Sequence, residues 1–226
     1  MNIKKWLGIV ALLALASCKN ETLPPVSLEP GIYAIQPGNE FVYSVDSINY
    51  NDFTSRIDTF RFQMRERVDS ILEQTSTTKK IRIFQESLDP ITQSWNPIAT
   101  VLVTFAPGVV RSTEDNNQFI RLILPIYEGN SWKGNVLTNN EPWNNDWEYY
   151  YYNVWRSKEV LGKNFDSTVS VNWVESSTFI DETLGEETYA QGIGRIHRRF
   201  KNIRFKIDGN IESGYDVTWS LKSWKK

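Results

Sequence analysis

The sequence predicts an all-β protein: a single domain of about ten antiparallel strands that forms a curled sheet, an open barrel or a sandwich. Apolar and polar residues alternate with a period of two in one segment after another, which is the pattern of half-buried strands. Turn-forming residues separate these segments. Aromatic residues, which favour strands, are abundant, with nine Trp, ten Tyr and eleven Phe. Because large twisted sheets seldom stay open and flat, we expect this sheet to curl on itself or to double.

The expected strands follow one another with short links. In the first, Phe41, Tyr43 and Val45 share one face. The clearest covers 60–65, where apolar residues alternate with arginine and glutamine. Further candidates lie at 81–83, 100–105, 119–124, 169–173, 203–207 and 215–221. The expected separators are Pro107-Gly108, Asp115-Asn116-Asn117, Glu128-Gly129-Asn130, Leu184-Gly185 and Asp208-Gly209-Asn210.

One segment, 141–160, fits two secondary structures. Its aromatic residues recur at nearly helical spacing, and Pro142 is suited to a first helical turn. The uninterrupted aromatic run 149–152 instead favours a strand, because aromatic side chains pack well on a pleated surface. We expect a strand here.

The start of the chain has the pattern of an export signal. Lys4 and Lys5 provide a positive charge, and residues 6–16 form an apolar run that is shorter than the roughly 20 residues needed to span a bilayer. Small residues then precede Cys18. The segment 1–17 therefore reads as a cleavable signal peptide, either of a lipoprotein or of an ordinary secreted protein with an incidental cysteine.

This pattern resembles the signal of bacterial lipoproteins. The resemblance implies cleavage before Cys18, acylation of that cysteine and anchoring in the cell envelope. Two or three acyl chains make a durable anchor, because each buried CH₂ contributes about 0.8 kcal/mol. Lys19 stands where inner-membrane lipoproteins of enterobacteria carry Asp, so the resemblance implies the outer membrane, on either its periplasmic or its surface face.

The proline-rich segment that follows is expected to be a tether. Residues 18–39 contain Pro24, Pro25, Pro30 and Pro37, which exclude a regular helix or a central strand. The remaining residues, 40–226, are enough for one domain with a substantial core.

Charge, cysteine and histidine content exclude several functions. A formal net charge of −2 gives no general attraction to nucleic acid. Cys18 is the only cysteine, so its acylation excludes a disulfide, a thiol nucleophile and a cysteine-bound metal. His197 is the only histidine, and no phosphate loop, dinucleotide fingerprint, EF-hand or Gly-x-Ser-x-Gly elbow is present. The sequence predicts no cofactor, no metal and no catalytic residue.

Two further runs resemble small lipoproteins of the Bacteroidota. They are Leu-Pro-Ile-Tyr-Glu-Gly-Asn-Ser-Trp-Lys-Gly-Asn at 124–135 and Glu-Thr-Tyr-Ala-Gln-Gly-Ile-Gly-Arg-Ile at 187–196. The resemblance covers about a tenth of the chain and carries over no catalytic residue. In all-β content alone, the chain is also similar to lipoproteins and carriers whose unclosed barrels hold acyl chains.

The densest aromatic segment, 132–155, is a candidate ligand site. Flat rings beside short asparagine side chains suit a sugar, whose C–H face stacks on aromatics while its hydroxyls take hydrogen bonds. A core strand followed by an asparagine-rich turn is the structural alternative. The candidate ligand-binding residues are Trp132, Trp143, Trp147, Tyr149, Tyr151 and Trp155.

A cationic stretch is the second candidate site. It follows the acidic segment 181–187, and Gly185 allows the two to fold as a hairpin, with a bulge or bend at 192–194. Cross-strand ion pairing is the structural interpretation, and docking on an anionic envelope surface is the functional one. His197 is expected to be a solvated strand residue. The candidate anion-contact residues are Arg195, Arg198, Arg199 and Lys201.

Together these observations predict a membrane-anchored, non-catalytic binding or structural module that holds a lipid-like ligand on an apolar sheet face or joins an envelope protein complex. The alternative is a carbohydrate-binding lipoprotein that uses 132–155, and the third possibility is an enzyme with an unrecognised site. The direction of the large aromatic side chains distinguishes the binding classes: a lipid holder needs them to line an open cavity, a carbohydrate binder needs an exposed coplanar pair, and a structural protein needs neither.

Overall fold

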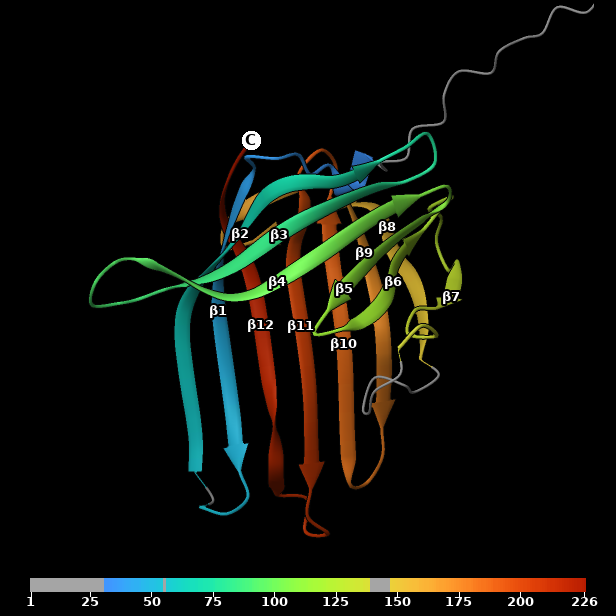
Figure 1. Cartoon of the computed structure of the whole chain (residues 1–226). Coiled ribbons are helices and arrows are strands. Elements are labelled where there is room, and N and C mark those ends of the chain that lie inside the picture. The colour runs from blue at the N-terminus through green and yellow to red at the C-terminus, as the bar shows by residue number, and fades with distance from the viewer. Residues whose placement is uncertain (1–30, 55, 139–146) are drawn as a thin grey trace, which may run out of the picture.

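The computed structural model describes residues 31–54, 56–138 and 147–226, and it confirms the all-β prediction (Figure 1). Within these residues, twelve strands form one sheet in which all neighbours are antiparallel. Its strand order is β6-β5-β4-β3-β2-β1-β12-β11-β10-β9-β8-β7. A short 3₁₀ turn, η2 (Gly31–Tyr33), precedes them. The strands are β1 (Glu40–Asn51), β2 (Arg56–Gln74), β3 (Lys79–Leu88), β4 (Trp95–Ala106), β5 (Val109–Glu114), β6 (Asn117–Ile123), β7 (Ser131–Lys133), β8 (Glu148–Val160), β9 (Lys163–Ser177), β10 (Asp181–Ala190), β11 (Gly194–Phe205) and β12 (Ile211–Lys225).

The first and last strands pair in the middle of the sheet. Tyr43 of β1 lies opposite Leu221 of β12 on one side and Met64 of β2 on the other, and all three side chains are buried. This leaves β6 and β7 as the two edges of the sheet. Every pairing of the sheet lies within 31–226, so a chain that begins at residue 19 retains all the described contacts.

The two edges meet, so that the sheet nearly closes as a barrel. The backbone N–H of Ile120 in β6 donates to Gly134 O at 2.7 Å. The Tyr151 hydroxyl of β8 donates to Ile123 O at 2.8 Å and accepts from Ile123 N at 2.9 Å. These contacts satisfy edge groups that would otherwise be open to another chain.

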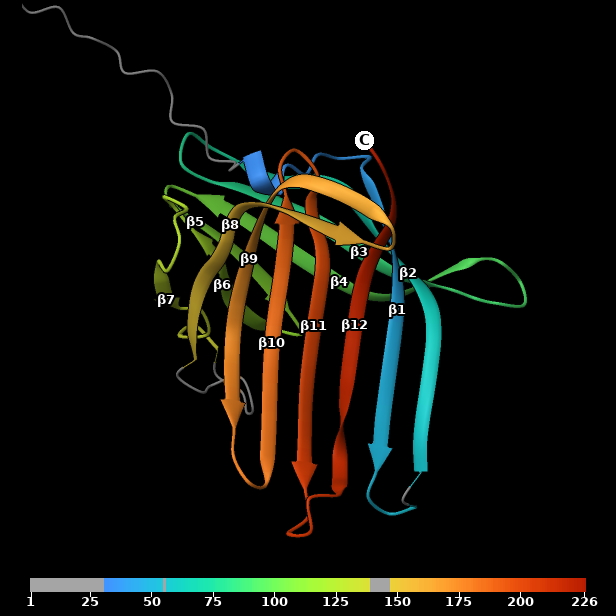
Figure 2. The ribbon, with the colours of Figure 1, turned by 180° about the vertical axis from the view of Figure 1, so that it is seen from behind.

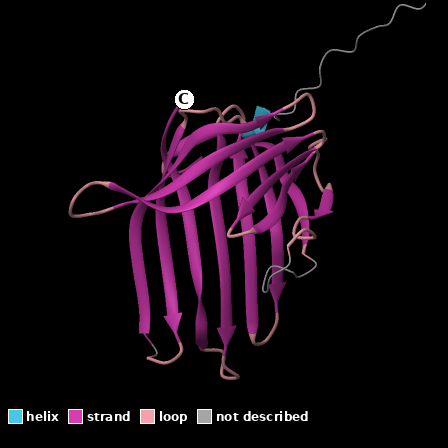
Figure 3. Cartoon of the chain, viewed as in Figure 1, coloured by secondary structure: helices cyan, strands magenta, loops and turns pink. Residues whose placement is uncertain are grey.

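The curled sheet has a closed half and an open half. In Figures 1 and 2, β3 to β6 cross over the upper parts of the long strands, whereas the lower parts of β2, β1, β12, β11, β10 and β9 extend below them as a single layer. Figure 3 shows the same division, with strands in nearly every part of the described chain. The core fills the closed half, where Tyr43, Val103, Phe105, Leu122 and Trp173 are buried.

Two expectations about chain boundaries are corrected. The sequence predicts a tether that reaches residue 39, but Ile32 and Ile35 are buried in the core, so the later part of that segment belongs to the fold. Leu184-Gly185 was predicted as a turn, but both residues lie within β10. Gly185 is needed there for space, because a Cβ atom would lie 2.7 Å from Cε3 of Trp173. The β10–β11 hairpin turns at 191–193 instead.

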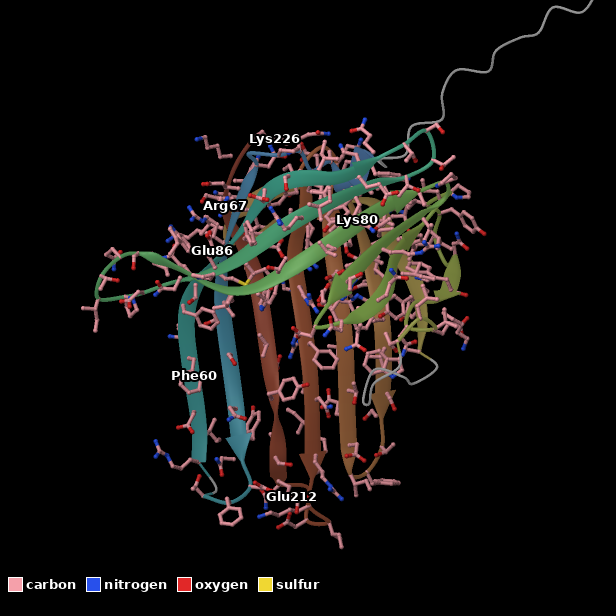
Figure 4. All side chains as sticks on the ribbon, in the orientation of Figure 1. Phe60, Arg67, Lys80, Glu86, Glu212 and Lys226 are labelled. Carbon is pink, nitrogen blue, oxygen red and sulfur yellow. The ribbon has the colours of Figure 1, made fainter. Side chains whose placement is uncertain are left out.

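The segment 148–160 forms β8, as expected from its aromatic run. The rest of the ambiguous segment, 141–146, lies outside the described residues. The clearest predicted strand, 60–65, lies within β2. Its Phe60 faces the same side as core residue Val45 but stands below the closed half and is 54% exposed (Figure 4).

Candidate functional site

A cavity of about 230 Å³ lies between the crossing strands and the long strands. The β5–β6 turn and the early part of β4 form its rim. Tyr149 of β8, Trp173 of β9 and Trp219 of β12 form its inner wall together with Arg198 of β11. The cavity therefore draws side chains from both layers of the curled sheet. Its other principal lining residues are Gln85, Glu114, Asn117, Phe119 and Arg121.

A chain of alternating acids and arginines runs through the interior behind this cavity. Arg195 is buried between two carboxylates, with Nη2 at 2.5 Å from Glu66 Oε1 and Nη1 at 2.8 Å from Glu187 Oε1. Tyr43 and Gln85 donate further hydrogen bonds to Glu66. The Tyr189 hydroxyl donates to Glu187. A buried charge of this kind is stable only because opposite charges and hydrogen bonds surround it.

The same alternation continues into the cavity wall. Arg198 Nη1 lies 3.3 Å from Glu114 Oε2, and its Nε lies 3.8 Å from Glu187 Oε1. Arg121 Nη2 lies 2.8 Å from Glu114 Oε1, and its Nε donates to Ser112 Oγ. With Glu66 and Arg195, three acids balance three arginines, so the network has no net charge.

Aromatic rings hold these guanidinium groups in place. The Arg198 guanidinium lies 4.8 Å from the Trp173 ring centroid and 5.0 Å from that of Trp219. Arg121 lies 4.4 Å from the Phe119 ring and 4.9 Å from the Trp173 ring. Stacking on rings and bonding to carboxylates together fix both cations, which gives the cavity a rigid polar wall.

Two carboxylates of the network, Glu114 and Glu187, are held in the ionised form by their arginine neighbours. Burial alone would raise the pKa of Glu114, but the charges of Arg121 and Arg198 outweigh burial and hold that pKa well below its ordinary value. Burial likewise opposes ionisation of Glu187, and its arginine neighbours again lower the pKa. Burial raises the pKa of Tyr149 to about 12, so its hydroxyl keeps its proton and can donate it.

Three residues that line the cavity each carry a buried polar atom with no hydrogen-bond partner within the described part of the chain. The atoms are the Tyr149 hydroxyl, Nε1 of Trp173 and Oδ1 of Asn117, and each belongs to a residue at most 5% exposed. An orphaned buried polar group costs about 1–3 kcal/mol, so native structures seldom leave one, let alone three, around one cavity. The set offers one donor, one acceptor and one group that is both.

Below the cavity, the inner face of the sheet becomes apolar. Trp219 is followed on the same face of β12 by Val217 and Tyr215, and Arg198 is followed on β11 by Phe200. The Phe200 ring lies 5.7 Å from Tyr215 and 6.2 Å from Trp147. We call this surface the apron; it comprises Phe60, Trp147, Val174, Phe200, Tyr215 and Val217, of which all but Phe200 are half-buried or exposed.

The four predicted anion-contact residues do not share a face. Arg195 and Arg198 point into the network described above. Arg199 lies on the outer face, 2.7 Å from Asp216, and Lys201 lies there 2.6 Å from Glu182. His197 is half-buried, with Nε2 at 3.5 Å from Glu186 Oε1. The cross-strand ion pairing expected as the structural interpretation is therefore present on the outer face.

The aromatic candidates are also distributed over several environments. Tyr149 and Tyr151 are buried in the core, and Trp132 packs on both and donates from Nε1 to Ile120 O at 2.8 Å. Trp147 belongs to the apron. Trp155 is 49% exposed at a position of positive φ in β8, and Trp143 lies outside the described residues. Of the six, the structure brings Tyr149 to the cavity and Trp147 next to it.

Sequence analysis missed most of the cavity. No local motif connects the residues that line it, which come from four strands: Glu114 (β5), Asn117 and Arg121 (β6), Trp173 (β9) and Trp219 (β12). One signal was available: the alternation through Phe60, Phe62 and Met64 continues to Glu66, which places a carboxylate on the apolar face. A charged residue at an inward position indicates an internal partner, although not which one.

Among the described residues, no three His, Cys, Asp or Glu side chains are grouped so that they could hold a metal ion. The described part of the chain also contains no helix that is long and apolar enough to cross a membrane. No protein-family model matches the chain, and no curated protein matches its sequence.

Proposed function

We propose that this protein is a non-catalytic binding protein of the cell envelope that holds a small amphipathic molecule, with the polar group of the ligand in the cavity and its apolar part on the apron. The observation that carries the proposal is that three residues lining the cavity, Asn117, Tyr149 and Trp173, each hold a buried polar atom without a partner, next to an apolar surface.

The cavity favours an uncharged polar group. At about 230 Å³ it is smaller than the roughly 300–1,000 Å³ of sites for drug-sized ligands, which suits a group no larger than a monosaccharide. Arg121 and Arg198 are already paired with Glu114, so an ionic group would have to displace a carboxylate or remain without a counter-charge. A polyol or an amide instead supplies both donors and acceptors to the orphaned atoms.

The apron favours an apolar extension on the same ligand. Phe60, Tyr215 and Val217 leave apolar area in contact with water, and each CH₂ group that covers such a surface contributes about 0.8 kcal/mol. The period of two in β11 and β12 places this surface directly below Arg198 and Trp219 of the cavity wall. A single molecule can therefore contact both.

The electrostatics support binding rather than acid–base catalysis. A general acid or base works best when its pKa lies near the operating pH. The pKa values of Glu114 and Glu187 lie below their ordinary range, far from neutrality. Each carboxylate is also engaged by two arginines, which leaves it poorly placed to exchange a proton with a ligand.

The location of the protein is part of the proposal. Acylation of Cys18 would anchor the chain, preferentially in the outer membrane, and place the cavity where envelope lipids and glycolipids are available. Feeding an alkyne-tagged fatty acid to cells tests this, because the wild-type protein should take up the label and the Cys18→Ser variant should not. Label on both proteins, or on neither, contradicts the anchor.

The binding proposal is tested with the chain from residue 19, purified without detergent and examined by native mass spectrometry. We expect octyl glucoside, below its micelle concentration, to form a one-to-one complex, and glucose and octyl sulfate to bind more weakly. Phe60→Ser should weaken the binding of octyl glucoside but not that of glucose. Leu161→Ser, at a residue of nearly equal exposure away from the apron, should change neither. Equal binding of all three probes, or none, refutes the proposal.

A further inference from the structure

Three neighbouring hairpins end together at the open side of the molecule. They are the β1–β2, β11–β12 and β9–β10 hairpins, which are consecutive in the strand order β2-β1-β12-β11-β10-β9. Figures 1 and 2 show their turns along the lower end of the sheet, and Glu212, which begins the return of β12, is labelled there in Figure 4. Since strands lie about 4.8 Å apart, adjacent tips are separated by roughly 10 Å.

Each of these tips carries a large apolar side chain in full contact with water. Phe53 is 96% exposed, Phe179 is 101% exposed and Ile207 is 102% exposed. Ile180, next to Phe179, is 46% exposed. A single exposed apolar residue needs no explanation, but one at each of three consecutive tips forms a row.

We infer that this row of tips docks on a lipid bilayer, with Phe53, Phe179 and Ile207 entering the interface between headgroups and acyl chains. Protein partners are usually bound by a contiguous patch with a packed apolar core. Here each anchor projects alone from its own turn, and a fluid bilayer can accept separated side chains without a matching surface.

The three turns can move from water towards a bilayer at a reduced cost, because several of their backbone N–H groups are already hydrogen-bonded. The Asn51 side chain accepts hydrogen bonds from the backbone N–H groups of Phe53 and Thr54, both at 3.0 Å. Thr178 Oγ1 does the same for Ile180 and Asp181 at 3.2 and 2.9 Å. Asp208 accepts from Asn210 N at 3.0 Å. Backbone groups that are already bonded lower the cost of approaching the hydrocarbon region.

Cations border the row. Arg56 and Arg204, with side chains 73% and 63% exposed, lie within a few residues of the tips. Each is paired with a carboxylate, Arg56 with Asp58 at 3.2 Å and Arg204 with Glu212 at 3.3 Å. Their long stems allow the charged ends to remain among lipid headgroups while the apolar tips go deeper. The apron begins just above, so a docked molecule would present its apolar surface, and then its cavity, to the bilayer.

The docking end also points away from the start of the described chain. The short turn η2, blue in Figure 1, and the C-terminal Lys226, labelled in Figure 4, lie at the upper end, opposite the three tips. A chain tethered through its N-terminal segment would thus hold this end free to meet a membrane surface.

Flotation with phosphatidylcholine vesicles tests the inference on the chain from residue 19. The parent should float with the vesicles, each tip changed singly to Ser should lower the partition coefficient about tenfold, and the triple variant Phe53→Ser, Phe179→Ser, Ile207→Ser should remain at the bottom. Ile91→Ser is the matched control, because Ile91 is 91% exposed in the turn between β3 and β4, outside the row.

Three flotation results would overturn the inference: a parent that does not float, a triple variant that floats as well as the parent, or an Ile91→Ser variant whose partition coefficient falls as much as that of a tip variant. Concentration-dependent dimers of the parent that the triple variant cannot form would assign the tips to a second copy instead. An unchanged urea midpoint confirms that the variants fold. The inference stands apart from the proposed ligand, because the triple variant should still bind octyl glucoside in solution.

Discussion

Replacing Tyr149 by Phe should make the unliganded protein more stable and its ligand binding weaker. The Tyr149 hydroxyl is buried at the cavity without a hydrogen-bond partner among the described residues. Removing it therefore removes a desolvation penalty and breaks no bond of the free protein. If the ligand supplies the missing bond, the same change removes a contact of the complex.

The expected magnitudes follow from the hydrogen-bond inventory. An unpaired buried hydroxyl costs about 1–3 kcal/mol, so Tyr149→Phe should raise the free energy of unfolding by at least about 1 kcal/mol. For a domain of this size, that corresponds to a rise of roughly 2–4 °C in Tm. Loss of one hydrogen bond to a ligand, at about 1.4 kcal/mol, should lower the affinity for octyl glucoside about tenfold.

Tyr151 provides the matched control, because it lies two residues along the same strand and is equally buried. Its hydroxyl bonds to both N and O of Ile123, so Tyr151→Phe should lower the free energy of unfolding by about 1–3 kcal/mol and leave the affinity unchanged. Urea unfolding and native mass spectrometry of both variants measure the two effects. A Tyr149→Phe variant that is destabilised like Tyr151→Phe, with wild-type affinity, would refute the reasoning.

Three further predictions concern the interior. Arg195→Met should lower the free energy of unfolding in urea by about 3–5 kcal/mol, because it leaves buried Glu66 without its cation and Glu187 with Arg198 alone; a loss below 1 kcal/mol would contradict the network. The pKa values of Glu114 and Glu187 are lowered in the folded protein, so ionisation of these carboxylates contributes to the free energy of unfolding. That contribution should be complete above about pH 5 and should decline as the pH falls below about 4.5. Unfolding curves that coincide at pH 7 and pH 3.5 would exclude this linkage. Gly185→Ala should lower the free energy of unfolding by about 1–3 kcal/mol and so lower Tm, because the Cβ atom of the alanine would lie 2.7 Å from the Trp173 ring. An unchanged Tm would mean that the ring can move aside.

The fold class was accessible from sequence because alternation is a local property. The pattern at Phe41, Tyr43 and Val45 depends only on which face of one strand is buried, and the structure places all three in the core. The turn predicted at Leu184-Gly185 failed because glycine has two uses. There it makes room for Trp173, a residue twelve positions earlier in the chain, and no local pattern distinguishes that from a turn.

The cavity was not accessible in the same way. Trp173 and Arg198 approach each other only because β9 and β11 flank the same strand, and Arg121 reaches them only because the sheet curls. The aromatic segment 132–155 looked like one site because its residues are close in sequence. In β8, the alternation of faces points the Tyr149 side chain inward, and the irregular register further along the strand leaves Trp155 exposed.

The pairing of β1 with β12 has a consequence for how the chain assembles. The centre of the sheet joins residues about 180 positions apart, such as Glu40 and Lys225, whereas both edge strands come from the middle of the chain. The two halves can form as separate meanders, but they become one sheet only when the last strand arrives, and such distant pairing slows folding. The first described residue, Gly31, and the C-terminal Lys226 are also neighbours, because both bond to Gly192. Joining them with a short linker and opening the chain between β6 and β7 would give a circular permutant in which the central seam becomes a hairpin and that long-range closure step is removed.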